Sequence, residues 1–326
     1  MAGTEFEIIR RYFNRQQAGR EDVIAGIGDD AALLRVPAGM ELVACIDTLV
    51  AGVHFPLHTS AAAIGHKALA VNLSDLAAMG AEPAWATLSL TLPESDPAWL
   101  EGFAQGFFAL AERYRVQLVG GDTTRGPLVV TVQALGFVAA GTALRRRGAQ
   151  PGDRIYVTGT LGDAGLALLL GEKAAGALRS RLDFPEPRVD VGLQLHGLAS
   201  AAIDISDGLL ADLAHLLEAD DLGAVIEADA VPRSDAFLAG AGTAGAGQAS
   251  RFYELPLSAG DDYELCFTVP AAHCEALERR LADLSGGCKA IGVVEARPGI
   301  RCRRASGEDY LPAGSGYQHF SGDRHG

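Results

Sequence analysis

Short apolar runs that end in Gly and Asp alternate with longer stretches of helical spacing along most of the chain. The clearest helix is expected over 61–79, where Ala, Leu and Val recur at helical spacing and Gly80 followed by Pro83 marks the end. Strands are expected over 41–47, 85–92, 128–138, 154–158 and 201–205, and another begins at 117–119 and leads into 120–122. Further helices are expected over 99–114, from 166 and over 209–218. A strand, a helix and a strand should follow between 263 and 294. This alternation predicts an α/β fold with mixed sheets.

A basic, turn-rich segment at 145–152 (RRRGAQPG) is the expected domain boundary. It divides the chain into domains 1–147 and 148–326, and both show the same alternation of strand and helix. The 239–249 segment is rich in Gly and Ala and is expected to be a loop.

The net charge and the cysteine content of the chain restrict which kinds of molecule it can bind and where it can function. The formal net charge of −14 argues against nucleic acid and against an anionic membrane surface, and it favours small ligands and metal cations. No run approaches the roughly 18 apolar residues that span a bilayer. The five cysteines are scattered and form no Cys-x-x-Cys pair, which argues against a zinc site or a disulfide framework. We therefore expect a cytoplasmic protein.

Aspartates recur at the edges of apolar segments, next to Gly or another small residue. They are Asp29, Asp30, Asp47, Asp75, Asp122, Asp204, Asp207, Asp261 and Asp262. Taken singly, each can be a turn or helix-cap residue, as Asp207 before Gly208 illustrates. If they gather in one pocket, however, they repel one another unless divalent cations neutralise them.

Asp75 is the aspartate least easily explained as a cap. It lies inside the expected helix with no other charged residue between Lys67 and Glu82. An interior carboxylate without a partner costs several kcal/mol, about the effective penalty for burying an ion, so it requires a cation or a strong donor. Oxygen ligands of this kind suit Mg²⁺.

The sequence motifs of other common enzyme classes are absent or poorly placed. The chain has no Gly-x-x-x-x-Gly-Lys-Ser/Thr, Gly-x-Ser-x-Gly or His-Glu-x-x-His segment. The Gly-x-Gly-x-x-Gly match at 240–245 lies in the Gly/Ala segment without a preceding strand, so we treat it as chance. The turn at 158–165 (TGTLGDAG) either presents amides to a phosphate at a helix start or is a plain tight connection.

Six segments together resemble the thiamine-monophosphate kinase family, in order and over nearly the whole chain. They are 28–32 (GDDAA), 47–55 (DTLVAGVHF), 67–80 (KALAVNLSDLAAMG), 120–126 (GGDTTRG), 204–209 (DISDGL) and 262–265 (DYEL). The resemblance implies the two-domain fold shared with aminoimidazole ribonucleotide synthetase. It also implies synthesis of thiamine diphosphate from thiamine phosphate and ATP, the last step of that pathway, by a homodimer that dimerises through its N-terminal domain.

Carried over residue by residue, the resemblance implies three sets of site residues. The Mg²⁺ ligands are Asp30, Asp47, Asp75, Asp122, Asp204 and Asp207. ATP contacts are implied for Gly121, Asp122, Arg146 and Ser206. Thiamine phosphate contacts are implied for His54, Asp261 and Tyr317, with a turn role for His54 and a packing role for Tyr317 as the alternatives. The N-terminal domain would carry most of the metal and ATP motifs, and the C-terminal domain would complete the ATP and substrate site.

Two departures from the family pattern bear on the site. Cys45-Ile46 stands where hydroxyl residues usually precede the aspartate, and Asp261 replaces a usual Glu. The resemblance otherwise predicts direct, in-line transfer without a general base, since the phosphate of thiamine phosphate is largely a dianion with a second pKa of about 6. The alternatives are another ATP-using enzyme of the same fold and a non-catalytic sensor of nucleotide or cation.

Overall fold

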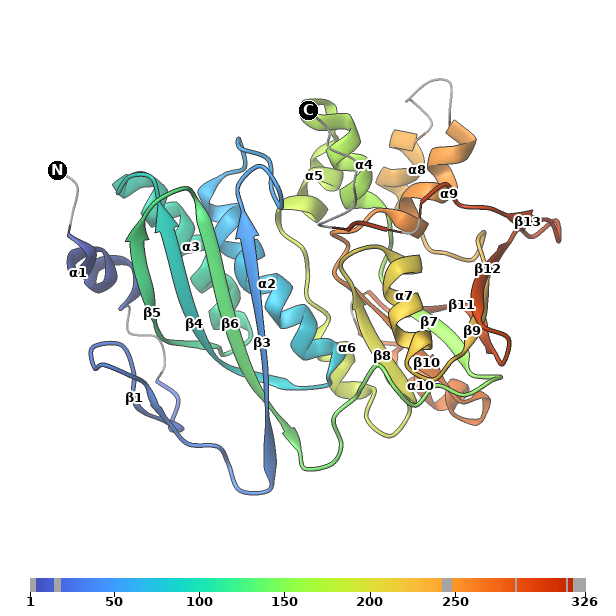
Figure 1. Cartoon of the computed structure of the whole chain (residues 1–326), viewed down its shortest axis with the longest axis horizontal. Coiled ribbons are helices and arrows are strands. Elements are labelled where there is room, and N and C mark those ends of the chain that lie inside the picture. The colour runs from blue at the N-terminus through green and yellow to red at the C-terminus, as the bar shows by residue number, and fades with distance from the viewer. Residues whose placement is uncertain (1–3, 15–18, 242–247, 285, 315, 319–326) are drawn as a thin grey trace. The chain divides into compact units, whose positions relative to one another are not determined.

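The computed structural model of the chain describes residues 4–14, 19–241, 248–284, 286–314 and 316–318 (Figure 1). The chain divides into two compact units. Unit 1 contains residues up to Ala143 together with Asp183–Val189, and unit 2 contains Leu144–Leu182 and the residues from Asp190 on. The division lies close to the basic segment at 145–152, but the return of 183–189 to unit 1 was not expected.

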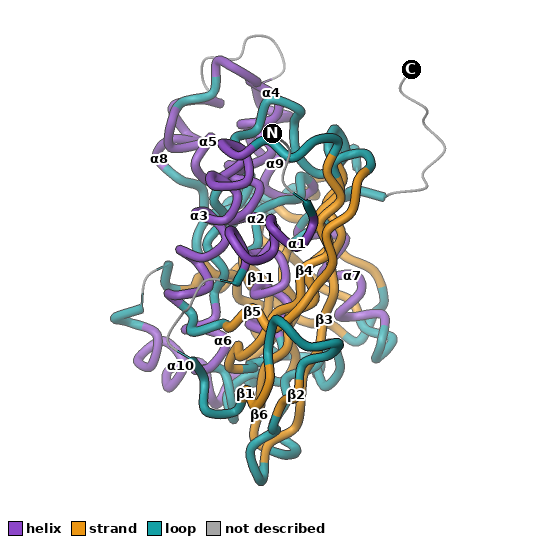
Figure 2. Tube along the Cα trace, turned by 90° about the vertical axis from the view of Figure 1, so that its left-hand side faces the viewer, coloured by secondary structure: helices purple, strands orange, loops and turns teal. Residues whose placement is uncertain are grey.

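Unit 1 is built on a four-stranded sheet in the order β3-β6-β4-β5, in which only β4 and β5 are parallel. Two helices, α2 and α3, pack side by side on one face of this sheet (Figures 1 and 2). The main elements are β3 (Met40–Val50), α2 (Ala61–Ala78), β4 (Glu82–Leu92), α3 (Pro97–Arg113), β5 (Gln117–Arg125) and β6 (Val129–Ala139). The smaller ones are α1 (Glu5–Ile8), the π-helical turn η1 (Ile9–Phe13), β1 (Val23–Ala25) and β2 (Leu33–Leu34).

Local residues determine where the helix α2 begins and ends. The Ser60 hydroxyl accepts a hydrogen bond from the Ala63 amide at the start, and Gly80 takes a positive φ of 65° just after the end. A Cβ at Gly106 of α3 would lie 1.9 Å from the Ala62 carbonyl oxygen, so only glycine permits this close approach of the two helices.

On the opposite face of the sheet, Trp85 and Phe137 are covered by residues of β1 and β2, whereas the part formed by β3 is open within unit 1. Along β3 the side chains alternate between half-buried and exposed. Leu42 and Ile46 are 45% and 62% exposed, although both are large and apolar.

Unit 2 contains a seven-stranded mixed sheet in the order β13-β12-β9-β11-β7-β10-β8, in which only β12 and β9 are parallel. Its strands are β7 (Arg154–Thr158), β8 (Ala201–Ile205), β9 (Gly223–Glu227), β10 (Glu264–Val269), β11 (Cys288–Glu295), β12 (Gly299–Arg303) and β13 (Asp309–Tyr310). Its helices are α4 (Asp163–Leu170), η2 (Gly171–Lys173), α5 (Gly176–Asp183), α6 (Val189–Gln194), α7 (Leu209–Glu218), α8 (Asp235–Ala241), α9 (Gln248–Ser258), η3 (Ala271–His273) and α10 (Cys274–Leu281). The buried strands β8 and β10 lie at the core beside α7.

Several sequence expectations need correction. The helix expected from residue 166 begins earlier, at Asp163, because Gly162 takes a positive φ of 90° and starts it. The expected loop at 239–249 is helical at both ends, in α8 and α9, and its residues 242–247 lie outside the described part of the chain. No helix in that described part combines the length and the apolar character needed to cross a membrane.

Candidate active site

A cavity of about 740 Å³ in unit 1 gathers three of the predicted site residues. Asp30, Gly121 and Asp122 line it together with residues of α1, η1 and β4. The Gly121 backbone packs directly on β4, since a Cβ there would lie 1.9 Å from the Leu88 carbonyl oxygen. Asp30 and Asp122 are both exposed, so their carboxylates can meet a ligand that enters the cavity.

Asp47 of β3 and Asp75 of α2 lie close enough for their side chains to interact. Burial raises the pKa of Asp47, and the interaction with the Asp75 side chain partly offsets the rise. Two carboxylates in contact share either a proton or a cation. Cys45 lies on the same side of β3, and burial, followed by the charges of Asp75 and Asp47, raises the pKa of its thiol.

The expectation that aspartates stand at strand ends is wrong for two positions. Asp47 pairs with Val132 inside β3, and Asp122 pairs with Ser89 inside β5. The ladders continue past both residues because their neighbours on β6 and β4 keep the register.

His54 supports the turn that follows β3. Its Nδ1 accepts a hydrogen bond of 3.0 Å from the Val50 amide, and its carbonyl oxygen accepts one of 3.3 Å from Lys67 Nζ. The imidazole is thus oriented by its own turn. Its contact with thiamine phosphate stays a prediction.

In unit 2, a loop from Ser206 to Gly208 joins β8 to α7 and is held by a residue that the sequence reasoning missed. One carboxylate oxygen of Asp212, Oδ2, accepts hydrogen bonds from the amides of Ser206, Asp207 and Gly208 at 3.0, 3.0 and 3.1 Å. Burial, then the charges of Asp204 and Asp207, raises the pKa of Asp212 to about 7. The sequence signal that could have identified Asp212 is its position as an acidic residue in the first turn of a helix that follows Asp-Gly.

The same loop meets two other predicted residues from distant parts of the chain. The Asp261 amide donates to the Ser206 carbonyl oxygen at 2.9 Å, and the Tyr317 amide donates to the Asp207 carbonyl oxygen at 3.0 Å. The Tyr317 side chain is 46% exposed, which does not suit the alternative packing role. Unit 2 therefore brings Ser206, Asp207, Asp261 and Tyr317 to one place.

Arg146 lies in the exposed segment before β7. The carbonyl oxygen of the preceding residue, Arg145, accepts a hydrogen bond of 2.9 Å from the Ala202 amide, so this segment runs beside the start of β8. Asp204 lies two residues further along the same strand and is 4% exposed.

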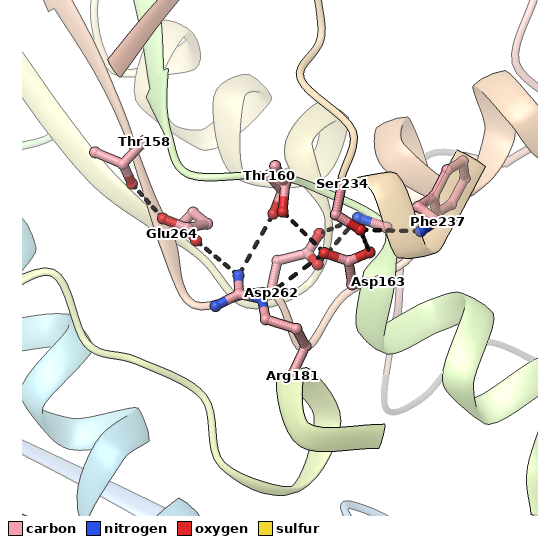
Figure 3. Close-up of polar contacts among 9 residues, drawn as sticks. Thr158, Thr160, Asp163, Arg181, Ser234, Phe237, Asp262 and Glu264 are labelled. Atoms are coloured by element: carbon pink, nitrogen blue, oxygen red, sulfur yellow. Dashed lines mark hydrogen bonds and ion pairs between the residues drawn. The ribbon is translucent and has the colours of Figure 1, made fainter. Parts of the chain in front are cut away.

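Three amides of the turn at 158–165 are used for hydrogen bonds within unit 2. The amides of Gly159 and Leu161 donate to the carbonyl oxygens of Gly286 and Pro232, and the Gly162 amide donates to both carboxylate oxygens of Asp262 at 3.0 Å (Figure 3). With these donors used internally, the plain connection is the better interpretation of this turn.

Within the described residues, no group of three or more His, Cys, Asp or Glu side chains is arranged to hold a metal ion. The full ligand set taken from the resemblance thus stays a prediction. Unit 1 contains the carboxylate pair Asp47 and Asp75 and the acidic group around Asp30. Unit 2 contains the acidic group around Asp207.

The chain matches two family models, the AIR synthase related protein N-terminal domain over residues 28–138 and the C-terminal domain over 150–304. It is 49% identical to a thiamine-monophosphate kinase of Salmonella typhimurium over 98% of this chain and 99% of the relative. The crystal structure of thiamine-monophosphate kinase from Stenotrophomonas maltophilia K279a matches with a TM-score of 0.82 and 46% identity, over 94% of this chain and 96% of that chain.

A further solved structure, "AaThiL complexed with AMPPCP and TMP", matches with a TM-score of 0.75 and 33% identity, over 90% of this chain and 92% of that chain. These matches confirm both the resemblance seen in the six motifs and the expected two-domain fold. The chain belongs to the thiamine-monophosphate kinase family, within the AIR synthase related proteins.

Proposed function

We propose that the protein transfers the terminal phosphoryl group of ATP to thiamine phosphate, which forms thiamine diphosphate and ADP in the last step of thiamine diphosphate synthesis. The observation that carries this proposal is family membership over nearly the full length of both chains. A relative that holds AMPPCP, an ATP analogue, together with TMP supports direct transfer between two molecules bound at once.

Several Mg²⁺ ions are part of the proposal. Their ligands are Asp30, Asp47, Asp75, Asp122, Asp204 and Asp207. The donors fit, because carboxylate oxygens suit this hard cation and because the contact between Asp47 and Asp75 is relieved by a cation that both share. Bound Mg²⁺ would neutralise phosphate charge and so lower the repulsion between the two anionic substrates.

ATP is assigned to Gly121, Asp122, Arg146 and Ser206. Gly121 and Asp122 line the 740 Å³ cavity, where the close backbone packing of Gly121 leaves the cavity side open. The Ser206 amide is already engaged by Asp212, so Ser206 would contact ATP through its hydroxyl group. Arg146 is exposed and carries a permanent charge suited to phosphate.

Thiamine phosphate is assigned to His54, Asp261 and Tyr317. A carboxylate at Asp261 suits the positively charged thiazolium ring of this substrate, and the exposed ring of Tyr317 offers an aromatic surface close to the same loop. The attacking group would be a phosphate oxygen of the substrate, which is mostly a dianion at neutral pH because its second pKa is about 6. This chain's residues therefore need only to bind and orient it, and no general base is required.

We also propose a homodimer that forms through the open sheet face of unit 1, and a cytoplasmic location. Leu42 and Ile46 expose large apolar side chains on that face, which a second copy of the chain would cover. The five cysteines are free thiols, which suits a reducing compartment.

The test is to measure thiamine diphosphate and ADP formed by the purified protein with and without Mg²⁺. A Mg²⁺-dependent, equimolar appearance of both products supports the proposal. A non-catalytic sensor would bind the substrates in a calorimeter and form no ADP, and that result would exclude the kinase. Trapping of labelled phosphate on the protein would contradict direct transfer.

A further inference from the structure

The connection between α9 and β10 contains an unusual backbone turn. Asp261 and Tyr263 have positive φ values of 68° and 50°. Residues with a Cβ rarely adopt this left-handed conformation, since the Cβ approaches the following carbonyl oxygen. Two such residues within three positions persist only where the surroundings determine the backbone, and this pattern concentrates at functional sites.

One side of the turn is fixed by backbone hydrogen bonds. The Asp261 amide donates to Ser206 O at 2.9 Å and the Tyr263 amide donates to Ile205 O at 2.8 Å. At Gly260, a Cβ would lie 2.1 Å from the same Ser206 oxygen, so the two segments are in close contact. These bonds fix the position of the turn against the end of β8, but they leave the direction of its side chains to other groups.

The other side of the turn is anchored by the Asp262 side chain. It is 2% exposed, and both of its carboxylate oxygens accept from the Gly162 amide at 3.0 Å (Figure 3). Gly162 is closely packed, because a Cβ there would lie 2.9 Å from the Pro256 nitrogen, and its φ of 90° favours glycine. The anchor point therefore lies in a well-packed part of unit 2.

A buried polar network supports this anchor. Glu264, two residues after Asp262, accepts hydrogen bonds from Thr158 Oγ1 at 2.6 Å and from Arg181 at 2.7 Å (Figure 3). Asp163, which is 1% exposed, accepts from the hydroxyl groups of Thr160 and Ser234. The side chains at 262 and 264 thus both lie in this buried polar region.

Tyr263 orients the carboxylate of Asp261 directly. Its hydroxyl group donates to Asp261 Oδ1 at 3.1 Å, and its ring is 8% exposed. The Asp261 side chain is half-buried, and this hydrogen bond fixes the direction of its carboxylate.

We infer that Asp262 and Tyr263 are positioning residues for the phosphate acceptor, which hold Asp261 in the one direction that binds it. This inference rests on the proposed function. Neither residue contacts the substrate in this scheme.

The experiment compares Asp262→Ala and Tyr263→Phe with the wild-type protein by steady-state kinetics with each substrate varied. We expect both variants to raise KM for thiamine phosphate by roughly 10-fold or more, a scale typical of groups that orient a binding side chain, with KM for ATP unchanged within about 2-fold. Asp262→Asn should restore a KM near the wild-type value, because its amide oxygen still accepts from Gly162.

Asp229→Ala is the matched control. Asp229 also accepts from a backbone amide, that of Ala305 at 2.7 Å, and from a tyrosine hydroxyl group, that of Tyr253 at 2.7 Å, but it is exposed and its partners belong to other segments. It should leave both KM values unchanged.

The activity of the wild-type protein distinguishes a failure of the proposed function from a failure of the positioning role. If it forms no thiamine diphosphate, the proposed function fails, whatever the variants do. If it is active and both KM values rise together, or if Tyr263→Phe leaves KM for thiamine phosphate unchanged, the positioning role is wrong. Should Asp262→Ala fail to fold, Tyr263→Phe decides alone, since it removes one hydroxyl group and no buried anchor.

Discussion

Replacing Arg181 by Met should destabilise unit 2 through the carboxylates that it leaves behind. Arg181 of α5 donates to Glu264 at 2.7 Å and lies 3.8 Å from Asp163. These two carboxylates are 0% and 1% exposed, whereas the Arg181 side chain is 21% exposed. Removing one partner of a buried ion pair typically lowers the free energy of unfolding by about 3–5 kcal/mol.

Partial exposure of Arg181 and the remaining hydroxyl donors place the expected loss near the lower end, at about 3 kcal/mol. For a unit of this size, each kcal/mol lowers Tm by about 2–4 °C, so a fall of roughly 6–12 °C is expected. The assay is thermal unfolding followed by circular dichroism, with ΔG from urea unfolding as an independent measure.

The control is Arg279→Met, which breaks an Arg–Glu pair whose side chains are 70% and 83% exposed and should change ΔG by less than about 1 kcal/mol. Adding Glu264→Gln to Arg181→Met removes the stranded charge and should recover at least half of the loss. If Arg181→Met matches the surface control, or if the double variant is no more stable than the single one, the charge-compensation argument is wrong.

Three further outcomes are expected. Asp75→Asn should abolish thiamine diphosphate formation while Tm stays at or above the wild-type value, because it removes one of two carboxylates in contact; near-normal turnover at low Mg²⁺ would contradict this. Burial lowers the pKa of His66 below its usual 6.5, because the buried ring is held in the neutral form. The free energy of unfolding is therefore unaffected by His66 above about pH 6.5, and it falls as pH drops from there through the lowered pKa. His66→Gln should flatten that part of the urea-derived ΔG profile, and an unchanged slope would refute it. Ile46→Asp on the open sheet face should convert the proposed dimer to a monomer in analytical ultracentrifugation, whereas a wild-type monomer would exclude the dimer.

Local sequence signals predicted the elements whose ends are set by their own residues. The helix α2 was expected over 61–79 and is observed over Ala61–Ala78, because Ser60 caps it and Gly80 ends it. The strand β5 was expected to begin at 117–119 and to lead into Gly120-Gly121-Asp122, and it continues to Arg125. The Gly120-Gly121-Asp122 segment has the composition of a turn, and only its parallel pairing with β4 keeps it extended. That pairing joins residues far apart in the chain, so no local pattern could reveal it.

The aspartates of the candidate site were even harder to assign from local sequence. Asp163, Asp212 and Asp262 are buried, with 1%, 4% and 2% exposure, and their oxygens are taken by hydroxyl groups and backbone amides of their own unit. Asp30 and Asp122, by contrast, are exposed on the wall of a cavity. Both kinds stand beside small residues near turns and helix starts, so the sequence pattern alone could not separate them.

What separates the two kinds of aspartate is the number of donors already within reach. The Asp212 carboxylate accepts three amides and so serves to shape the loop that carries Ser206 and Asp207. A carboxylate whose neighbour is another carboxylate, as with Asp47 and Asp75, is stabilised most by a cation that both share. The site therefore depends on acids with two different roles. Exchanging Asp212 for Ala should disturb the loop geometry, because three amides lose their acceptor, whereas Asp75→Asn should remove cation affinity and leave the geometry intact.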